Sequence, residues 1–202
     1  MAESTSIARS SLLDSQIRAG ARVELQDGWQ VAVRFPREPA IGGNALVDLS
    51  HRGTFEINGP ATASAIQSLC SSDLALRKIH RGSGFEAYRL TPTRSIVFGR
   101  NPGGEAIDVT GGWASLALVG PNARDILQKI TAVDVRDVTF PILGCCQGPI
   151  FGVNTLFGHF EKHYELHVCS DSIEFLQEVL LDGGGEFGLQ MAGSQFLGDA
   201  LK

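Results

Sequence analysis

The stretch Leu116-Ala-Leu-Val-Gly-Pro-Asn-Ala-Arg-Asp-Ile-Leu127 contains the features that decide the fold. Its apolar run from Leu116 to Val119 predicts a strand, and the Gly120-Pro121 pair that follows predicts a turn. The apolar residues after the turn recur at helical spacing, so we expect a helix over 121–130. Proline suits the first helical position because its missing N–H has no helical partner there. The stretch therefore predicts a strand–turn–helix unit.

The same unit occurs earlier, as Phe55-Glu-Ile-Asn-Gly-Pro-Ala-Thr-Ala-Ser-Ala-Ile-Gln-Ser-Leu69. A shift of 61 residues superimposes Gly59-Pro60 on Gly120-Pro121 and Gln67 on Gln128. Self-similarity at a fixed offset indicates duplication of a structural unit. We therefore expect two related halves, with residues 41–110 and 111–202 as the two repeats and 1–40 as an N-terminal segment with a hairpin, all in one compact domain.

Strand and helix patterns alternate along the whole chain, joined by short links. The expected strands cover 46–49, 55–57, 85–90, 95–98, 115–119, 150–157 and 164–168. The expected helices cover 11–18, 60–71, 121–130 and a segment that a capping-box variant, Asp171-Ser-Ile-Glu174, starts and Gly183-Gly184-Gly185 ends. The polar first residues are expected to be loose, and the run from Phe140 to Pro149 is punctuated by Gly and Pro. This mixture with hairpin-length links predicts an α+β fold.

The N-terminal hairpin around Asp27-Gly28 has two possible registers. A two-residue turn would place the apolar residues of its second strand on the polar face of the first strand. A three-residue loop, Gln26-Asp27-Gly28, instead pairs Leu25 with Trp29 and Val23 with Val31. We prefer the three-residue loop because it keeps the apolar residues on one face.

The composition is that of a soluble globular protein. Of 202 residues, 43% are apolar and 19% charged, and the net charge of −5 gives no electrostatic reason to bind nucleic acid. The polar N-terminus does not resemble a secretory signal, and no apolar run approaches the roughly 20 residues of a membrane helix. Cysteines 70, 145, 146 and 169 show no Cys-x-x-Cys spacing. We therefore expect reduced thiols and a cytoplasmic protein that does not contact a membrane.

Three histidines, His159, His163 and His167, lie four residues apart. On a helix they would converge as metal ligands do, whereas on a strand neighbouring members would stand about 13 Å apart. Apolar residues alternate with them, which favours a half-exposed strand face. A metal-dependent protein that uses these histidines is the third of the functions we consider.

Three further motifs have both a chemical and a structural interpretation. Asp48-Leu-Ser-His51 has the residue types of a hydrolytic triad, but a polar turn bonded to local backbone is the preferred interpretation. Cys145-Cys146 lacks flanking cationic residues that would lower a thiol pKa, which favours packing over redox work. Asn101-Pro-Gly-Gly104 lacks the spacing and lysine of phosphate-binding loops and is interpreted as a linker. We therefore assign no catalytic, cofactor-binding or metal-ligating residue.

Two groups of residues resemble a known family. Ala45-Leu-Val-Asp-Leu-Ser-His-Arg-Gly-Thr-Phe-Glu-Ile-Asn-Gly-Pro60 resembles the early signature of the glycine-cleavage T-protein (aminomethyltransferase) superfamily. The second half resembles the gamma subunit of heterotetrameric sarcosine oxidase. That likeness is carried by Leu116–Leu127, Val133-Asp134, Phe140-Pro141, Gly144-Cys145-Cys146-Gln147, Tyr164-Glu-Leu-His-Val168 and Gly185-Glu-Phe-Gly-Leu189.

The resemblance implies a T-protein-like α+β fold of two related strand–helix halves, without the C-terminal barrel of full-length T-proteins. It implies an accessory, non-catalytic subunit of a sarcosine oxidase-type oxidoreductase complex in sarcosine catabolism and one-carbon metabolism. FAD, FMN, NAD and tetrahydrofolate would belong to the larger alpha and beta subunits, the flavoprotein partners in the heterotetramer.

Two departures from the family pattern bear on function. The Gly-Tyr-Thr-Gly-Glu signature that faces folate in T-proteins is absent, and Gly148-Pro149 stands where the gamma pattern has Thr. The amine substrate of the complex could therefore be a related N-methyl amino acid such as N-methylglutamate. The alternative function is a stand-alone folate-binding aminomethyltransferase-like protein.

Overall fold

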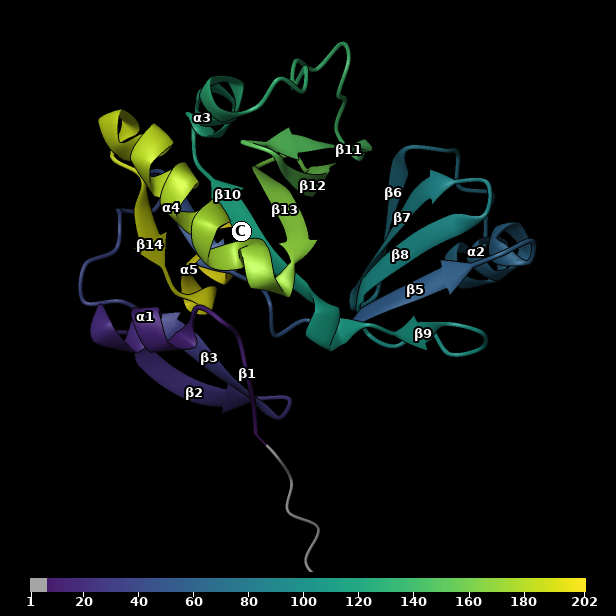
Figure 1. The fold of residues 1–202 in the computed structure, drawn as a ribbon, viewed down its shortest axis with the longest axis horizontal. Coiled ribbons are helices and arrows are strands. Elements are labelled where there is room, and N and C mark those ends of the chain that lie inside the picture. Colours follow the sequence, from purple (N-terminus) through teal and green to yellow (C-terminus); the bar gives the residue numbers. More distant parts are fainter. Residues whose placement is uncertain (1–6) are drawn as a thin grey trace, which may run out of the picture.

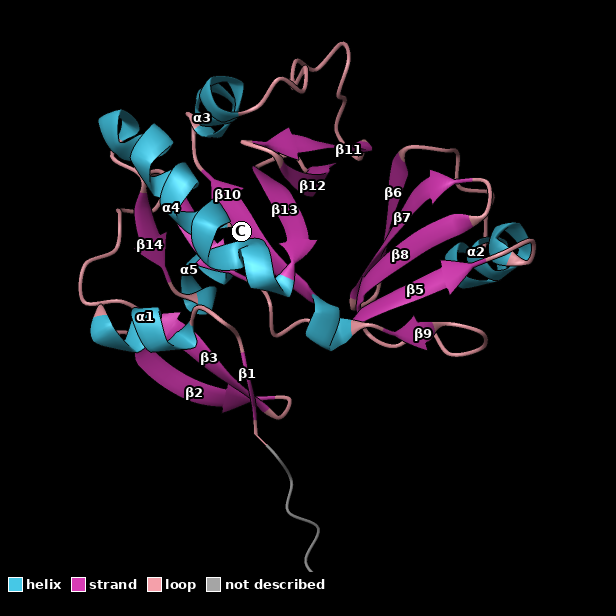
Figure 2. Cartoon of the chain, viewed as in Figure 1, coloured by secondary structure: helices cyan, strands magenta, loops and turns pink. Residues whose placement is uncertain are grey.

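The computed structural model describes residues 7–202, which form three sheets and five α-helices (Figures 1 and 2). The N-terminal end of the segment predicted to be loose, residues 1–6, lies outside the described residues. Sheet A has the order β1 (Ala8–Arg9), β3 (Trp29–Arg34) and β2 (Arg22–Gln26). The helices are α1 (Leu13–Arg18), α2 (Thr62–Cys70), α3 (Ala123–Ile130), α4 (Ile173–Gly184) and α5 (Ser194–Ala200).

Sheets B and C form the body of the molecule. Sheet B has the order β11 (Cys145–Ile150), β12 (Val153–His159), β13 (His163–Cys169), β10 (Trp113–Val119), β4 (Ala45–Asp48) and β14 (Gln190–Ala192). Sheet C has the order β6 (Lys78–Gly82), β7 (Phe85–Thr91), β8 (Arg94–Gly99), β5 (Thr54–Asn58) and β9 (Ile107–Asp108). Short 3-10 turns are η1 (Thr110–Gly112), η2 (Ser170–Ser172) and η3 (Gly185–Phe187).

The two halves share one topology, as the repeat predicted. The spatial order β6-β7-β8-β5 in sheet C equals the order β11-β12-β13-β10 in sheet B, and every one of these pairings is antiparallel. Helix α2 follows β5 and helix α3 follows β10, each after a Gly-Pro turn. The predicted α+β fold of two related strand–helix halves is confirmed.

The halves exchange their leading strands. Strand β4 precedes β5 in the chain but pairs antiparallel with β10 in sheet B. Strand β9 precedes β10 but pairs antiparallel with β5 in sheet C. Each sheet is therefore completed by the strand that leads, along the chain, into the other sheet, and this interlocks the two repeats.

Strand registers define which residues of the two halves are equivalent. The 61-residue shift places Thr54 on Ser115, and the pairing of these strands with β8 and β13 then places Phe98 on His167. The same reasoning makes Tyr88 equivalent to Gly158. Lys78 is equivalent to Gly144, and these two form an isolated bridge with each other. The halves are thus related by a pseudo-twofold axis that passes between the sheets.

Helices cover the outer faces of sheets B and C, and the inner faces of these two sheets meet (Figure 1). Helices α3 and α4 pack on sheet B in the largest apolar cluster, whereas α2 packs on sheet C in a smaller cluster. Ile79, Tyr88 and Phe98 of sheet C meet Leu156 of sheet B between the sheets. Within residues 7–202, no helix combines the length and apolarity that crossing a bilayer requires.

The Gly-Pro turns differ slightly from the prediction. Helices α2 and α3 begin at Thr62 and Ala123, so each proline lies in the turn and not at the first helical position. The preceding glycines have φ values of +98° and +123°, which are accessible to glycine at low cost. At Gly120 a Cβ would stand 2.7 Å from the Gly43 carbonyl oxygen, so this turn also requires the absence of a side chain.

The preferred hairpin register is wrong. The structure has the two-residue turn, which pairs Gln26 with Trp29 and Leu25 with Gln30. Asp27 and Gly28 have φ values of +49° and +83°, as a type I′ turn requires, and this turn matches the twist of the flanking strands. The assumption of one apolar face failed because β3 is central in sheet A and contacts both α1 and α5, whereas β2 is an exposed edge.

Several short elements have no clear signal in the sequence. Strand β11 lies almost wholly in the run punctuated by Gly and Pro, for which no strand was predicted, and β6, β9, β14 and α5 were not predicted either. The capping box does not form, since Asp171 Oδ1 accepts from the Ser172 hydroxyl and α4 begins at Ile173. The predicted end of this helix among the three glycines is confirmed at Gly184.

Candidate functional site

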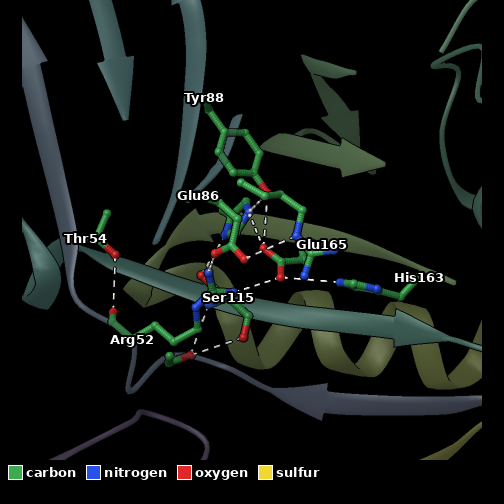
Figure 3. A network of polar contacts seen from close by, with 10 residues as sticks. Arg52, Thr54, Glu86, Tyr88, Ser115, His163 and Glu165 are labelled. Atoms are coloured by element: carbon green, nitrogen blue, oxygen red, sulfur yellow. Dashed lines mark hydrogen bonds and ion pairs between the residues drawn. The ribbon is translucent and has the colours of Figure 1, made fainter. Parts of the chain in front are cut away.

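A network of charged and polar side chains fills the space between sheets B and C (Figure 3). Its centre is Arg52, in the loop between β4 and β5, which pairs with a carboxylate from each sheet. The Arg52 Nη1 atom lies 2.8 Å from Glu165 Oε1 on β13, and its Nη2 atom donates to Glu86 on β7. Arg52 itself belongs to neither sheet, and it joins the two halves by binding both carboxylates.

Glu165 is the most deeply buried charge of the network. Its side chain is 4% exposed, and its Oε2 atom accepts a 3.1 Å hydrogen bond from Tyr88 Oη. Burial alone would raise the pKa of Glu165, but the neighbouring Arg52 charge holds it well below its ordinary value. Glu165 is therefore a carboxylate at neutral pH.

His167 connects this carboxylate to strand β10. Its Nδ1 lies 2.7 Å from Ser115 Oγ and its Nε2 lies 3.1 Å from Tyr88 Oη. Burial lowers the pKa of His167 to about 3, against the raising effect of Glu165, so the ring is neutral. Because Tyr88 donates to Glu165, we assign the proton of His167 to Nε2 and the acceptor role to Nδ1. The hydrogen bonds then run in one direction, from Ser115 through His167 and Tyr88 to Glu165.

The three predicted histidines lie on strands, as their alternation indicated, but not on a half-exposed face. His159 ends β12, while His163 and His167 lie on β13, and each is at most 5% exposed. Helices cover one face of sheet B and sheet C covers part of the other, so both faces of β13 are buried. Among residues 7–202, no three His, Cys, Asp or Glu side chains are arranged to hold a metal ion.

Asp48-Leu-Ser-His51 forms a polar turn, as predicted. Asp48 Oδ1 accepts from the Ser50 backbone N–H at 2.9 Å, and its Oδ2 accepts from Ser10 and Gln16 at 2.7 and 2.9 Å. The Ser50 hydroxyl accepts from the Ser115 N–H at 3.1 Å. The turn fixes where β4 ends and delivers the next residues, including Arg52, between the sheets.

The same turn recurs at the equivalent place in the other half. Asp108 Oδ1 accepts from the Thr110 N–H at 2.9 Å, and the Thr110 hydroxyl accepts from the Thr54 N–H at 2.9 Å. Asp108 is equivalent to Asp48, and Thr54 to Ser115. An Asp-x-Ser/Thr turn therefore closes each exchanged strand, and this structural role explains the motif.

The remaining motifs lie outside the network. All four cysteines are free, and burial raises the pKa of Cys145 to about 12 and that of Cys146 to about 11. Such thiols stay protonated at neutral pH, which agrees with a packing role. In the predicted linker, Asn101 Oδ1 accepts from the Gly103 N–H, which forms a surface turn before β9.

A surface cleft of about 680 Å³ opens beside the network. Its walls come from the β2–β3 turn, the loop after β4, and the ends of β7, β8 and β9. His51 lines this cleft, and burial lowers its pKa despite the opposing effect of Asp48. Arg52 also lines the cleft, so the buried network reaches solvent there.

Sequence reasoning missed Arg52, Glu86, Tyr88 and Glu165. One signal was available: Glu165 stands in the predicted strand 164–168 between two residues of the histidine pattern, where a charge needs a partner. The partner could not be identified, because Arg52 lies 113 residues away in the chain.

The model of the GCVT N-terminal domain family matches residues 96–198. The chain belongs to this family. The matched region contains β10, α3 and β13, and so includes Ser115, Glu165 and His167 of the network.

Aminomethyltransferases are among the similar proteins. That of Symbiobacterium thermophilum is 28% identical over 93% of this chain, and the chain covers 61% of its length. The sarcosine oxidase subunit alpha of Rhizobium meliloti is 35% identical over 44% of this chain and 10% of its own length. The chain thus spans about three fifths of the aminomethyltransferases it matches.

Two solved structures share the fold. The glycine cleavage system aminomethyltransferase T from Bartonella henselae superposes with a TM-score of 0.74, covering 95% of this chain and 61% of that chain at 16% identity. A chain of the heterotetrameric sarcosine oxidase from Corynebacterium sp. U-96 superposes with a TM-score of 0.64, covering 74% of this chain and 87% of that chain at 17% identity. The T-protein-like fold is therefore established.

Proposed function

We propose that this chain is an accessory, non-catalytic subunit of a heterotetrameric sarcosine oxidase-type enzyme. The complex would oxidatively demethylate sarcosine or a related N-methyl amino acid. The observation that carries the proposal is the superposition on 87% of a chain from a heterotetrameric sarcosine oxidase. Nearly all of that chain thus has a counterpart in this fold.

The buried network supports a role without a cofactor on this chain. A ligand between the sheets would need free hydrogen-bonding groups, but Arg52, Tyr88, Glu165 and His167 bind one another there. Such a ligand would have to break the Arg52–Glu165 pair, whose Glu165 side chain is buried, and this is costly. In this proposal FAD, FMN, NAD and tetrahydrofolate bind to the larger alpha and beta subunits, and the complex is cytoplasmic.

The test is assembly. The tagged chain, expressed in its own host, should co-purify with two larger subunits, and native mass spectrometry should detect a complex that contains it. The purified complex should have the visible absorption of flavin. A colourless chain that migrates alone under the same conditions, although the host expresses the oxidase, would refute the proposal.

The second candidate function is a stand-alone aminomethyltransferase-like protein of one-carbon metabolism. It is favoured by the higher TM-score of 0.74 over 95% of the chain. This function requires the isolated chain to bind tetrahydrofolate. Titration calorimetry with tetrahydrofolate at about 1 mM would detect binding of useful affinity. The absence of binding heat at this concentration would exclude the second function.

A further inference from the structure

Within residues 7–202, the outer face of sheet B carries a second helix, α4, that has no counterpart on sheet C. In the second half, α4 runs across α3 and the sheet, and Gly183 packs so closely on Ile130 that a Cβ there would stand 2.7 Å from Ile130 Cγ2. One apolar cluster joins residues of the sheet and α3 to residues of α4 and the segment after it. These residues are Leu46, Leu118, Ile126 and Ile130 on one side and Leu176, Leu180 and Leu189 on the other.

The equivalent residues of the first half line an open groove. The strand registers and the 61-residue shift make Ala106, Ile57, Ala65 and Leu69 the counterparts of Leu46, Leu118, Ile126 and Ile130. These four line a groove of about 350 Å³ between α2 and the segment 102–106. Ala65, Leu69 and Ala106 are only partly buried, whereas their counterparts are at most 6% exposed.

The sheet edge beside the groove is also open. Strand β14 pairs in parallel with Ala45–Val47 of β4, and the equivalent positions in the first half are 105–107. Strand β9 is the edge strand of sheet C, and its Ile107 is 58% exposed. Both parts of the covering unit, the helix and the strand, are therefore missing from the first half within residues 7–202.

Helix α2 carries no charge that would oppose burial of its exposed face against another chain. Its sequence, Thr-Ala-Ser-Ala-Ile-Gln-Ser-Leu-Cys, has no charged residue, although Ala63, Ser64 and Ser68 are exposed. Helix α3, by contrast, has Lys129 at the position of Ser68, and this lysine donates to the Gly183 carbonyl oxygen at 3.0 Å and to Glu186. Charged residues are depleted at the centre of protein interfaces.

We propose that this groove binds an amphipathic helix of a larger partner subunit, in the position on α2 that α4 occupies on α3. The inference rests on the proposed function for the identity of the partner. The groove is wide because the small Ala65 stands where the second half has Ile126. The helix would therefore insert leucine-sized side chains at i and i+4, the spacing of Leu176 and Leu180. Glu105 at the rim is exposed and would receive a basic side chain of that helix.

Two matched variants test the groove. Ser68 lines it, whereas the adjacent Gln67 is exposed and does not. Each is replaced by arginine, a good helix former, so that S68R and Q67R should both keep the melting temperature of the isolated wild-type chain. In co-expression with the large subunits, we expect S68R to reduce the yield of complex at least tenfold and Q67R to leave it unchanged.

The outcomes separate this inference from the proposed function. If wild type and S68R assemble equally well, the groove proposal is wrong but the subunit role stands. If the wild-type chain does not assemble with the large subunits, the proposed function and the groove's partner are both refuted. A wild-type homodimer that S68R dissociates would show that a second copy, and not a larger subunit, fills the groove.

Discussion

The imidazole of His167 stacks on the phenyl ring of Phe98, with ring centroids 3.8 Å apart and planes 13° apart. These two residues occupy equivalent positions in the two halves. The pseudo-twofold axis therefore passes between a phenyl ring and a neutral imidazole ring. The backbone is repeated in the two halves, but the side chains that meet between the sheets differ in chemistry. The second half supplies Glu165 and His167 where the first supplies Ile96 and Phe98.

Arg52 should be the most costly network residue to remove. Arg52→Ala leaves the Glu165 carboxylate buried without its main partner, and we expect a loss of about 3–5 kcal/mol in the free energy of unfolding. The control is Arg94→Ala, which removes the more exposed pair with Glu56 and should cost about 1 kcal/mol or less. Urea unfolding measures the free energy of unfolding of both variants. An equal loss in the two would show that the network contributes no more stability than an exposed ion pair.

Stability should fall on mild acidification because of His167. Its folded pKa, about 3, lies below the unfolded value of 6.5, so the unfolded chain binds the extra proton between these values. The effect is at most about 1.4 kcal/mol per pH unit, and the depressed pKa of Glu165 acts in the same direction. His167→Gln keeps a donor and an acceptor but does not titrate. The free energy of unfolding should therefore fall less between pH 7 and pH 5 for this variant than for the wild type. An identical fall in both proteins would refute this prediction.

The contact between Tyr88 and Gly158 should tolerate no side chain at Gly158. A Cβ there would stand 2.4 Å from Tyr88 Oη and 2.8 Å from Cε1, and Tyr88 is fully buried. We expect Gly158→Ala to destabilise the fold by about 1–3 kcal/mol or more. Gly185→Ala, which meets no atom within 4 Å, is the control and should be neutral. Thermal unfolding distinguishes the two.

Thiol reactivity should follow burial. The raised pKa values of Cys145 and Cys146 keep these thiols protonated at pH 8, whereas Cys169 is exposed. Iodoacetamide labelling followed by mass spectrometry should modify Cys169 first. Comparable labelling of Cys145 in the folded protein would show that the region around β11 opens.

The repeat was predictable from the chain, but the way its halves interlock was not. Two Gly-Pro turns 61 residues apart identified both strand–helix units because each turn has the same local chemistry. The exchange of strands depends on β9, which consists of only two residues, both exposed. Such a short strand has no periodic pattern that could be detected in the sequence. The network likewise depends on a pairing between Arg52 and Glu165, which lie 113 residues apart in the chain.

The hairpin shows how tertiary packing overrides a local pattern. Separating apolar from polar faces is a sound rule for a sheet with one wet face, but β3 contacts two helices and its successive residues Val31, Ala32 and Val33 are all buried. The Asp27-Gly28 turn chemistry was therefore the better guide to register. The histidines follow the same logic, since a strand buried on both faces still alternates in sequence.

The central claim is that the chain acts by assembling with larger subunits through its outer surface, and not by binding a ligand between its sheets. Hydrogen–deuterium exchange of the free chain, the chain with tetrahydrofolate and the chain within the oxidase complex tests it most directly. We predict that the complex protects α2 and the segment 102–106, while tetrahydrofolate alone changes nothing. Protection of β7 and β13 by tetrahydrofolate, with α2 unaffected in the complex, would contradict the account.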